Sequence, residues 1–159
     1  MTAIDVPVEG GTIHVVVSGP TSGKPVVLAV HGITASHVSW RTVARELGDA
    51  VTLLMVDLRG RGASTKAAPH GIAQHVDDLL AVLDHLEVVS PVLLGHSMGA
   101  YVVAALAATR PERASAVVLV DGGLALPVPA DADPEQVLDA TLGPAITRLR
   151  QTFESREAY

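Results

Sequence analysis

The sequence predicts an α/β protein with a mostly parallel sheet between two layers of helices. Four short apolar runs are typical of parallel strands covered on both faces. They span residues 25–30, 51–56, 92–94 and 116–120. Segments with helical spacing separate them, and this alternation of strand and helix favours right-handed crossovers and a three-layer arrangement. Residues 13–18 add an earlier strand.

Helices are expected between these strands. Residues 39–47 form the first. The second has one apolar face at helical spacing, with Asp77, Asp78 and Asp84 outside it. The apolar residues of that face are Ile72, Val76, Leu79, Leu80, Leu83 and Leu86. Residues 98–109 are small and apolar on all sides, so this third helix should be buried against the sheet.

The composition changes after Asp121. Residues 122–129 form a loop rich in Gly, Pro and Leu, and helical patterns follow it. We therefore expect a core of residues 1–123 and a second, helical part of residues 124–159.

The helical part begins at a recognisable signal. Asp133 followed by Pro134 is typical of a helix start, with an acidic N-cap and proline at the first helical position. The Gly143-Pro144 pair is expected to break this helix, which then restarts toward Phe153.

Composition limits the class of protein. With 159 residues, 48% hydrophobic and 18% charged, the chain suits one globular domain rather than a disordered segment. A net charge of −6 weighs against a nucleic-acid partner. The lack of cysteine excludes a disulfide scaffold and thiolate catalysis. No dinucleotide fingerprint or ligand cluster indicates a metal or organic cofactor. The N-terminus carries no secretory signal, so a cytoplasmic protein is expected.

One stretch could be mistaken for a membrane span. No charged residue lies between Glu87 and Arg110, and the stretch is long enough to cross a bilayer. Pro91 and Gly95 interrupt it, however, and its β-branched first half gives way to an Ala-rich second half. A strand, a sharp turn and a buried helix explain it better, and no membrane partner is expected.

The clearest chemical motif is Gly-His-Ser-Met-Gly at residues 95–99, which fits Gly-x-Ser-x-Gly. It follows a strand and opens a helix, so Ser97 should lie on a sharp turn above the sheet, at the positive end of the helix. The flanking glycines are expected because so tight a turn leaves no room for a Cβ. An ordinary strand-to-helix turn is the plainer interpretation, but the flanking elements favour a nucleophile.

A serine nucleophile needs a base for its proton and donors for the oxyanion that its attack creates. The amide of Met98, directly after the serine, is one natural donor. The loop with His31, Gly32 and Ile33 should supply the second. Gly32 would let this loop bend so that the Ile33 amide points at the same spot.

At this point the sequence resembles the α/β-hydrolase superfamily, in its capped esterase, lipase-like and C–C or epoxide hydrolase-like branch. The resemblance runs from about Ile13 to Asp121. The matching segments are, in order, residues 31–33, 57–64, 77–79 and 95–99. It implies an α/β-hydrolase sheet, followed by residues 124–159 as the incomplete start of a helical cap or lid.

The resemblance also implies site residues. Ser97 would be the nucleophile, and the backbone amides of Ile33 and Met98 would form the oxyanion hole. A serine at the centre of the motif argues against the dehalogenase and epoxide hydrolase branches, whose nucleophile is a carboxylate. Gly32, His37, His96 and Leu124 are expected around the substrate pocket.

The sequence departs from the family in its proton acceptor. The family's histidine base and its acid follow strands that lie beyond residues 116–120, and the chain stops before both. His31 and His96 lie beside the expected site, in turns whose usual function is structural. Asp121, which ends the sixth strand, is a candidate for the acid, against a turn or cap-anchoring function.

The remaining histidines fit the base no better. His14 lies on an early strand, and His75 and His85 lie on a surface helix, so each should be solvated or packed. His37 begins the helix after the oxyanion loop and should line the pocket rather than act as base. His70 lies in a polar loop with no assigned function.

The resemblance makes the chain look incomplete. Ending the sheet at residues 116–120 leaves a long, apolar, unpaired edge. We therefore expect the N-terminal part of a longer hydrolase, truncated before the last two strands of the sheet. The C-terminal remainder of the same protein would supply the histidine and the acid, and the isolated chain should be inactive or very weak.

Three functions remain open. The first is a serine hydrolase acting on an ester-type bond, or another acyl or C–C bond, of a small apolar substrate. Leu124, Leu126 and Val128 favour an apolar substrate, because they would form a hydrophobic roof over the pocket. The second is a ligand-binding or signalling protein that keeps the pocket as a receptor. The third is a degenerate homologue with an interaction role, whose exposed sheet edge forms an oligomer with another chain.

Other prominent residues have structural explanations. Arg59 and Arg61 could form an anion site, but arginines in this loop more often pair with carboxylates and hold the end of the strand. Asp57 is expected to be structural as well. Trp40, the only tryptophan, is better explained as a packing residue than as a substrate platform.

Overall fold

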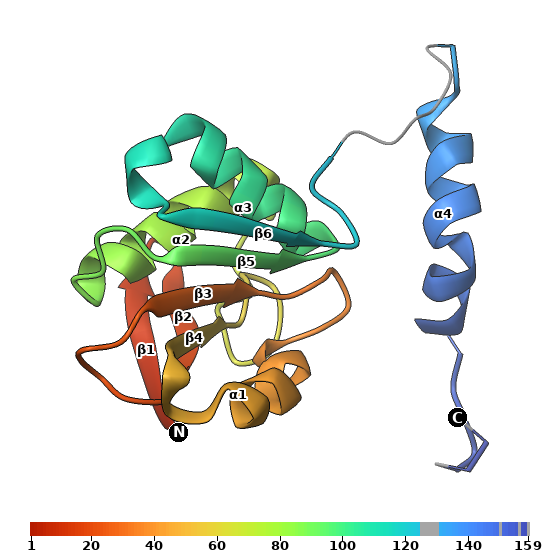
Figure 1. Ribbon diagram of the computed structural model, residues 1–159. Helices are drawn as coiled ribbons and strands as arrows, with labels where there is room; N and C mark the ends of the chain where they lie inside the picture. Colours follow the sequence, from red (N-terminus) through yellow and green to blue (C-terminus); the bar gives the residue numbers. More distant parts are fainter. Residues whose placement is uncertain (125–130, 150, 156, 159) are drawn as a thin grey trace. The chain divides into compact units, whose positions relative to one another are not determined.

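The computed structural model describes residues 1–124, 131–149, 151–155 and 157–158. The chain falls into two compact units, residues 1–124 and residues 125–159. The first unit contains a six-stranded sheet with the strand order β1-β2-β4-β3-β5-β6 (Figure 1). Its strands are β1 (Thr2–Val8), β2 (Gly11–Ser18), β3 (Val26–Val30), β4 (Thr52–Val56), β5 (Val92–His96) and β6 (Ala116–Val120).

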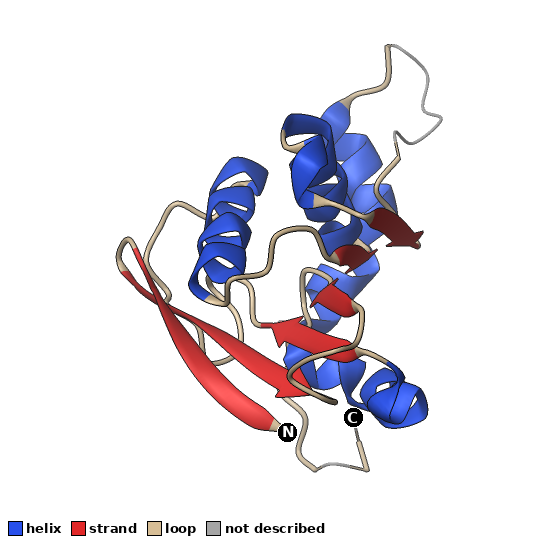
Figure 2. Cartoon of the chain, turned by 60° about the vertical axis from the view of Figure 1, so that its left-hand side comes forward, coloured by secondary structure: helices blue, strands red, loops and turns tan. Residues whose placement is uncertain are grey.

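The sheet is mixed and mostly parallel, as the sequence predicted. β3, β4, β5 and β6 run parallel to one another, whereas β2 pairs antiparallel with both β1 and β4. β1 is a strand that the sequence analysis missed, although Ile4, Val6 and Val8 alternate inward with the period of two that a half-buried strand requires. The long hairpin of β1 and β2 is seen from a second side in Figure 2.

The helices of the first unit cover both faces of the sheet. They are the 3-10 helix η1 (His37–Trp40), α1 (Arg41–Leu47), the 3-10 helix η2 (Gly48–Ala50), α2 (Ile72–His85), α3 (Met98–Thr109) and the 3-10 helix η3 (Pro111–Arg113). On one face, strand residues such as Leu28 and Val30 pack with residues of α2 and α3. On the other face Ala29 packs with Trp40 and Ala44. Successive strand residues point to opposite faces, and helices cover both faces, so the central strands are apolar on both sides. The three-layer prediction is confirmed.

The far edge of the sheet is apolar. β6 pairs with β5 on one side, and no other described strand lies beyond it. Val117, Val118 and Val120 are between 39% and 44% exposed, although a parallel strand of this composition is usually covered. The expected unpaired edge is therefore present in the part of the chain that the structure describes.

The uncharged stretch between Glu87 and Arg110 is divided as predicted. It forms β5, a turn at Ser97 and the helix α3. Of the helices within the described ranges, none has both the length and the apolar character that a bilayer crossing requires.

The polar residues of α2 differ from expectation. Asp78, predicted to lie outside the apolar face, is 2% exposed and pairs with Arg59 from the loop after β4. His75, predicted on a surface helix, is fully buried, and neither of its ring nitrogens has a hydrogen-bond partner. The helix is covered on this side by the loop after β4, which a helical-spacing argument does not include.

His75 should make the stability of the chain depend on pH. Burial lowers the pKa of His75 from its ordinary 6.5 to about 4. The unfolded chain therefore takes up the proton first as the pH falls, so the free energy of unfolding is highest above pH 6.5 and declines toward pH 4. The loss is expected to reach about 3 kcal/mol at the lower end.

Urea unfolding between pH 7.5 and pH 4.5 measures this loss. His75→Leu should flatten the pH dependence, whereas His85→Gln, at an exposed position on the same helix, should leave it unchanged. An equally steep profile in the His75→Leu variant would assign the effect to other groups.

The second unit contains one helix, α4 (Pro134–Leu149), in its described residues. The predicted start is confirmed, because the Asp133 carboxylate accepts a hydrogen bond from the amide of Glu135. The predicted break at Gly143-Pro144 is wrong: the helix continues through Pro144, since the fixed φ of proline is itself helical and its ring removes only one hydrogen bond. Ile146 and Leu149, predicted together with Phe153 to restart a helix, lie in this one continuous helix, whereas Phe153 lies beyond its end.

Candidate active site

Ser97 occupies the turn between β5 and α3 with an unusual backbone conformation. Its φ is 52° and its ψ is −120°, and residues other than glycine rarely adopt a positive φ. A Cβ on Gly95 would lie 2.6 Å from the backbone nitrogen and Cα of Ala100, and one on Gly99 would lie 2.6 Å from the carbonyl carbon of Val30. The steric explanation for the two flanking glycines is therefore confirmed.

The Ser97 hydroxyl makes no hydrogen bond with the described residues, and Ser97 itself is half-buried. The Ser97 amide donates to the carbonyl oxygen of Val120 at 2.9 Å, which ties the turn to the end of β6. Since Met98 is the first residue of α3, its amide has no acceptor within the helix and adds to the positive end of the helix dipole.

The loop after β3 lies directly against this turn. A Cβ on Gly32 would approach the Ser97 Cβ to 3.2 Å and the His96 Nδ1 to 3.3 Å. Gly32 has no positive φ, so the glycine is needed for close approach to the serine and not for the bend that the sequence analysis gave as its reason. The next residue, Ile33, is 41% exposed, and its carbonyl oxygen accepts a hydrogen bond from Arg61 Nε at 3.1 Å.

His31 is a structural residue in this arrangement. It is fully buried, its Nδ1 donates to the carbonyl oxygen of Gly32 at 2.7 Å, and its Nε2 accepts from the amide of Leu58 at 3.1 Å. Burial lowers the pKa of His31, which favours the neutral imidazole. With both nitrogens occupied by backbone groups, His31 connects the loops after β3 and β4 and leaves no lone pair for Ser97.

Asp57, at the end of β4, holds the start of η1. Its Oδ1 accepts from the amide of His37 at 2.6 Å and lies 3.0 Å from His37 Nδ1, and its Oδ2 accepts from the amide of Ala63 at 2.8 Å. Burial acts to raise the pKa of Asp57, but these N–H donors outweigh it and hold the pKa below its ordinary value. The structural function predicted for Asp57 agrees with these contacts.

His37 faces the strands away from Ser97. Besides Asp57, its ring lies 5.5 Å from the ring of His14 on β2. In the strand order β2 and β4 lie on one side of β3, whereas β5, which carries Ser97, lies on the other. The expectation that His37 lines the substrate pocket stays a prediction, and its contacts belong to the β2–β4 side of the sheet.

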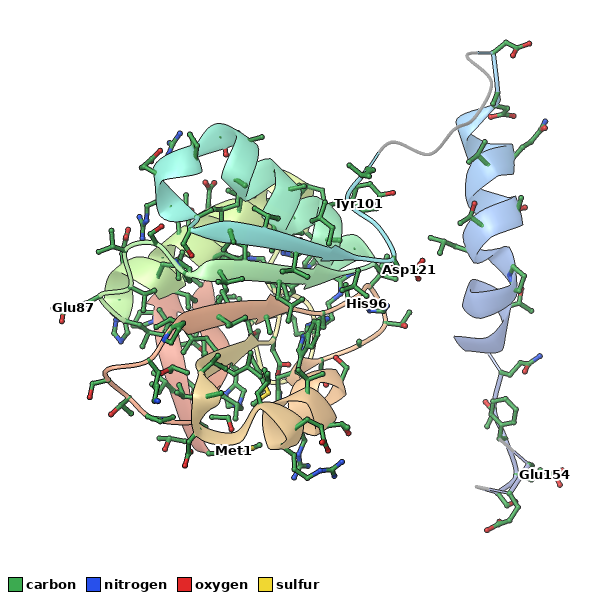
Figure 3. The ribbon with its side chains drawn as sticks, viewed as in Figure 1. Met1, Glu87, His96, Tyr101, Asp121 and Glu154 are labelled. Carbon is green, nitrogen blue, oxygen red and sulfur yellow. The ribbon has the colours of Figure 1, made fainter. Side chains whose placement is uncertain are left out.

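The other predicted site residues lie at the same end of the sheet as Ser97. His96 ends β5, and Asp121 directly follows Val120, the β6 residue paired with His96, so the two lie near each other in Figure 3. Asp121 is exposed, with φ at 52°, and a Cβ on the following Gly122 would lie 2.7 Å from the Ser97 carbonyl oxygen. Leu124 is 73% exposed, and its carbonyl oxygen accepts from the Tyr101 hydroxyl at 3.0 Å.

A shallow hollow at the opposite end of the sheet is not part of this site. It is lined by Leu83, Asp84, Glu87, Val88, Val89 and Arg113. Glu87 marks its position in Figure 3, far from His96 and Asp121. Arg113 there pairs with Asp84 at 2.8 Å and also donates to backbone carbonyls, so its charge is used within the fold.

The arginines of the loop after β4 separate into two functions. Arg59 is buried and pairs with the Asp78 carboxylate, which raises the pKa of Arg59, so its predicted pairing with a carboxylate is confirmed. Arg61 forms no ion pair with a described residue and donates instead to the carbonyl oxygens of Ile33 and Arg59. The sequence analysis missed this link from Arg61 to the oxyanion loop, because a side-chain bond to a distant carbonyl leaves no sequence pattern.

Comparison with known proteins identifies the family. The family model for the alpha/beta hydrolase fold matches residues 25–157. Lipase LipV of Mycobacterium tuberculosis is 40% identical over 114 residues, covering 72% of this chain. The chain belongs to the α/β-hydrolase family.

Solved structures agree with this assignment. An epoxide hydrolase from an endophytic Streptomyces is 34% identical, with a TM-score of 0.68 over 74% of this chain. The hypothetical protein PA1622 from Pseudomonas aeruginosa PAO1 is 26% identical, with a TM-score of 0.75 over 99% of the chain. The chain spans 43% of LipV, 36% of the Streptomyces enzyme and 57% of PA1622.

Proposed function

We propose that this chain carries the nucleophile and the oxyanion hole of a serine hydrolase that cleaves ester-type bonds of small apolar substrates. The proposal rests on Ser97, which lies between β5 and α3 with a positive φ and a hydroxyl that makes no hydrogen bond with the described residues. Such a turn lifts the Oγ above the sheet. A glycine could form the same turn without strain, so the strained backbone at Ser97 favours a functional reason for the serine.

The proposed chemistry proceeds through an acyl-enzyme. Ser97 Oγ attacks the carbonyl carbon of the ester while a base takes the hydroxyl proton, and the carbonyl oxygen becomes an oxyanion. The amides of Ile33 and Met98 would stabilise this oxyanion from the loop after β3 and from the N-terminus of α3. Collapse breaks the C–O bond of the ester, and the base gives its proton to the departing alcohol oxygen. Water, deprotonated by the same base, then hydrolyses the acyl group, and the base returns the proton to Ser97 Oγ.

The histidine base is proposed to come from outside these residues. Both nitrogens of His31 are bonded to backbone groups, those of His75 are buried with no hydrogen-bond partner, and His14 and His37 are held on the β2–β4 side. The chain spans less than half of LipV. The polypeptide that completes the enzyme would therefore carry the base and the acid, with Asp121 as the alternative acid within this chain.

The apolar substrate is inferred from the side chains around the turn. Ile33 and Leu124 are 41% and 73% exposed. Ile33 follows Gly32, which lies against the Ser97 Cβ, and the carbonyl oxygen of Leu124 accepts a hydrogen bond from Tyr101 on α3. Exposed apolar side chains beside a nucleophile favour an apolar acyl or ring group over a sugar or phosphate.

Covalent labelling by a fluorophosphonate tests the proposal. The complete gene product should react once per chain, and Ser97→Ala should abolish labelling, whereas Ser90→Ala, an exposed serine in a distant loop, should not change it. Without the base, the 159-residue chain should react about 10⁶-fold more slowly. A complete protein that binds an apolar ester but never reacts would support a receptor and contradict the proposal.

A further inference from the structure

A cluster of two imidazoles and a carboxylate lies outside the proposed active site. His14 comes from β2, His37 from η1, and Asp57 from the end of β4. One nitrogen or oxygen atom from each residue lies within 4.8 Å of the corresponding atoms of the other two. Asp57 is fully buried, and the side chains of His14 and His37 are 16% and 21% exposed, so the cluster lies just beneath the surface.

The buried carboxylate of this cluster has no fixed positive partner. Asp57 accepts hydrogen bonds from two backbone amides, which stabilise its ionised form, and His37 Nδ1 lies 3.0 Å from its Oδ1, but the described residues provide it with no ion pair to lysine or arginine. Arg59 is used by Asp78, and Arg61 donates to backbone carbonyls. Buried charges in proteins are normally paired or bound to a metal ion, so the Asp57 carboxylate would stabilise a cation bound beside it.

A second carboxylate contacts one imidazole of the cluster. Asp5 is the cross-strand neighbour of His14, and its Oδ1 lies 2.7 Å from His14 Nδ1. A carboxylate that accepts from Nδ1 fixes the tautomer in which Nε2 carries the lone pair. This carboxylate–histidine arrangement commonly supports a metal-ligating imidazole.

We propose that His14, His37 and Asp57 form a binding site for a divalent transition metal such as Zn²⁺. His14 would contribute Nε2, Asp57 would contribute Oδ1, and His37 would contribute a ring nitrogen, leaving a fourth position for water or a ligand oxygen. His37 Nδ1 and Asp57 Oδ1 are already 3.0 Å apart, close to the ~3.3 Å between neighbouring ligands of a tetrahedral zinc. This site was not expected from the sequence, because its ligands come from three separate segments in no recognised spacing.

Zinc titration by calorimetry, on protein without a histidine tag, tests the site, with the visible absorption of bound Co²⁺ as a second measurement. One ion should bind per chain, and His14→Gln or His37→Gln should weaken binding by about 100-fold. Asp5→Asn should weaken Zn²⁺ binding by about 10-fold. The Asp5 side chain is 62% exposed, so this substitution should not disturb folding. His85→Gln, an exposed histidine on α2, serves as the matched control and should have no effect.

Two results would overturn the site. The first is an absence of saturable Zn²⁺ binding to the folded chain, which would make the cluster a hydrogen-bonded support for η1. The second is binding that persists unchanged in the His14, His37 and Asp5 variants, which would assign the metal to surface histidines. Neither result bears on labelling of Ser97, so the two proposals are tested independently.

Discussion

Gly99→Ala is expected to lower the free energy of unfolding by about 3–5 kcal/mol. A Cβ at this position would overlap the Val30 carbonyl group and lie 2.7 Å from the His31 carbonyl oxygen. These are backbone atoms of β3 and of the loop that follows it, so they cannot move aside as a flexible side chain can. Relief of the overlap would require α3 to move away from the sheet, which would also disturb the turn at Ser97.

Chemical denaturation followed by circular dichroism measures this effect. Gly71→Ala is the matched control, because a Cβ there meets no atom within 4 Å and its φ of −73° is accessible to alanine. We expect this control to remain within about 1 kcal/mol of the native chain. A Gly99→Ala chain as stable as the control would show that α3 does not pack against β3 as closely as described.

Arg59→Met is expected to destabilise the chain by about 3–5 kcal/mol. Arg59 and Asp78 are both buried and joined by two hydrogen bonds, from Nε at 2.8 Å and from the second guanidinium nitrogen at 2.6 Å. Removing the arginine leaves the Asp78 carboxylate ionised and buried without its partner. It also removes the bond from Arg59 to the carbonyl oxygen of Glu9, which connects the loop after β4 to the β1–β2 hairpin.

A double variant separates the charge effect from the loss of packing. Arg59→Met with Asp78→Leu leaves no unpaired charge, so it should recover most of the lost stability. Arg45→Ala removes a comparable ion pair at the surface and should change stability by less than about 0.5 kcal/mol. If the double variant is no more stable than Arg59→Met alone, the loss comes from packing and backbone hydrogen bonds.

The strands of the parallel sheet and the turn at Ser97 could be predicted because their signals lie within a few adjacent residues. A strand buried on both faces is apolar at nearly every position, as β3 is throughout and β4 is after Thr52. The two glycines around Ser97 follow from steric overlap within one turn and with the strand beside it. The start of α4 at Asp133 is similarly local, because a cap requires only a side chain and the amide two residues later.

Predictions failed where a residue's environment comes from a distant segment. The burial of Asp78 and His75 depends on the loop after β4, which covers one side of α2. The continuation of α4 through Pro144 shows the converse error, in which a local rule was applied as an absolute stop. β1 pairs with β2 along its whole length, and its own inward-facing apolar residues form only a short alternating pattern.

The order of residues along the chain was enough to determine the fold class, the family resemblance and the position of the turn that carries Ser97, because periodicity and steric exclusion act over short distances. Which side chains meet across the sheet depended on how strands and loops cross in space. Arg61 contacts Ile33 because the neighbouring strands β3 and β4 end side by side, and the cluster of His14, His37 and Asp57 assembles because β2, β4 and η1 meet in space. Such contacts join residues far apart in the chain, and no short sequence window contains them.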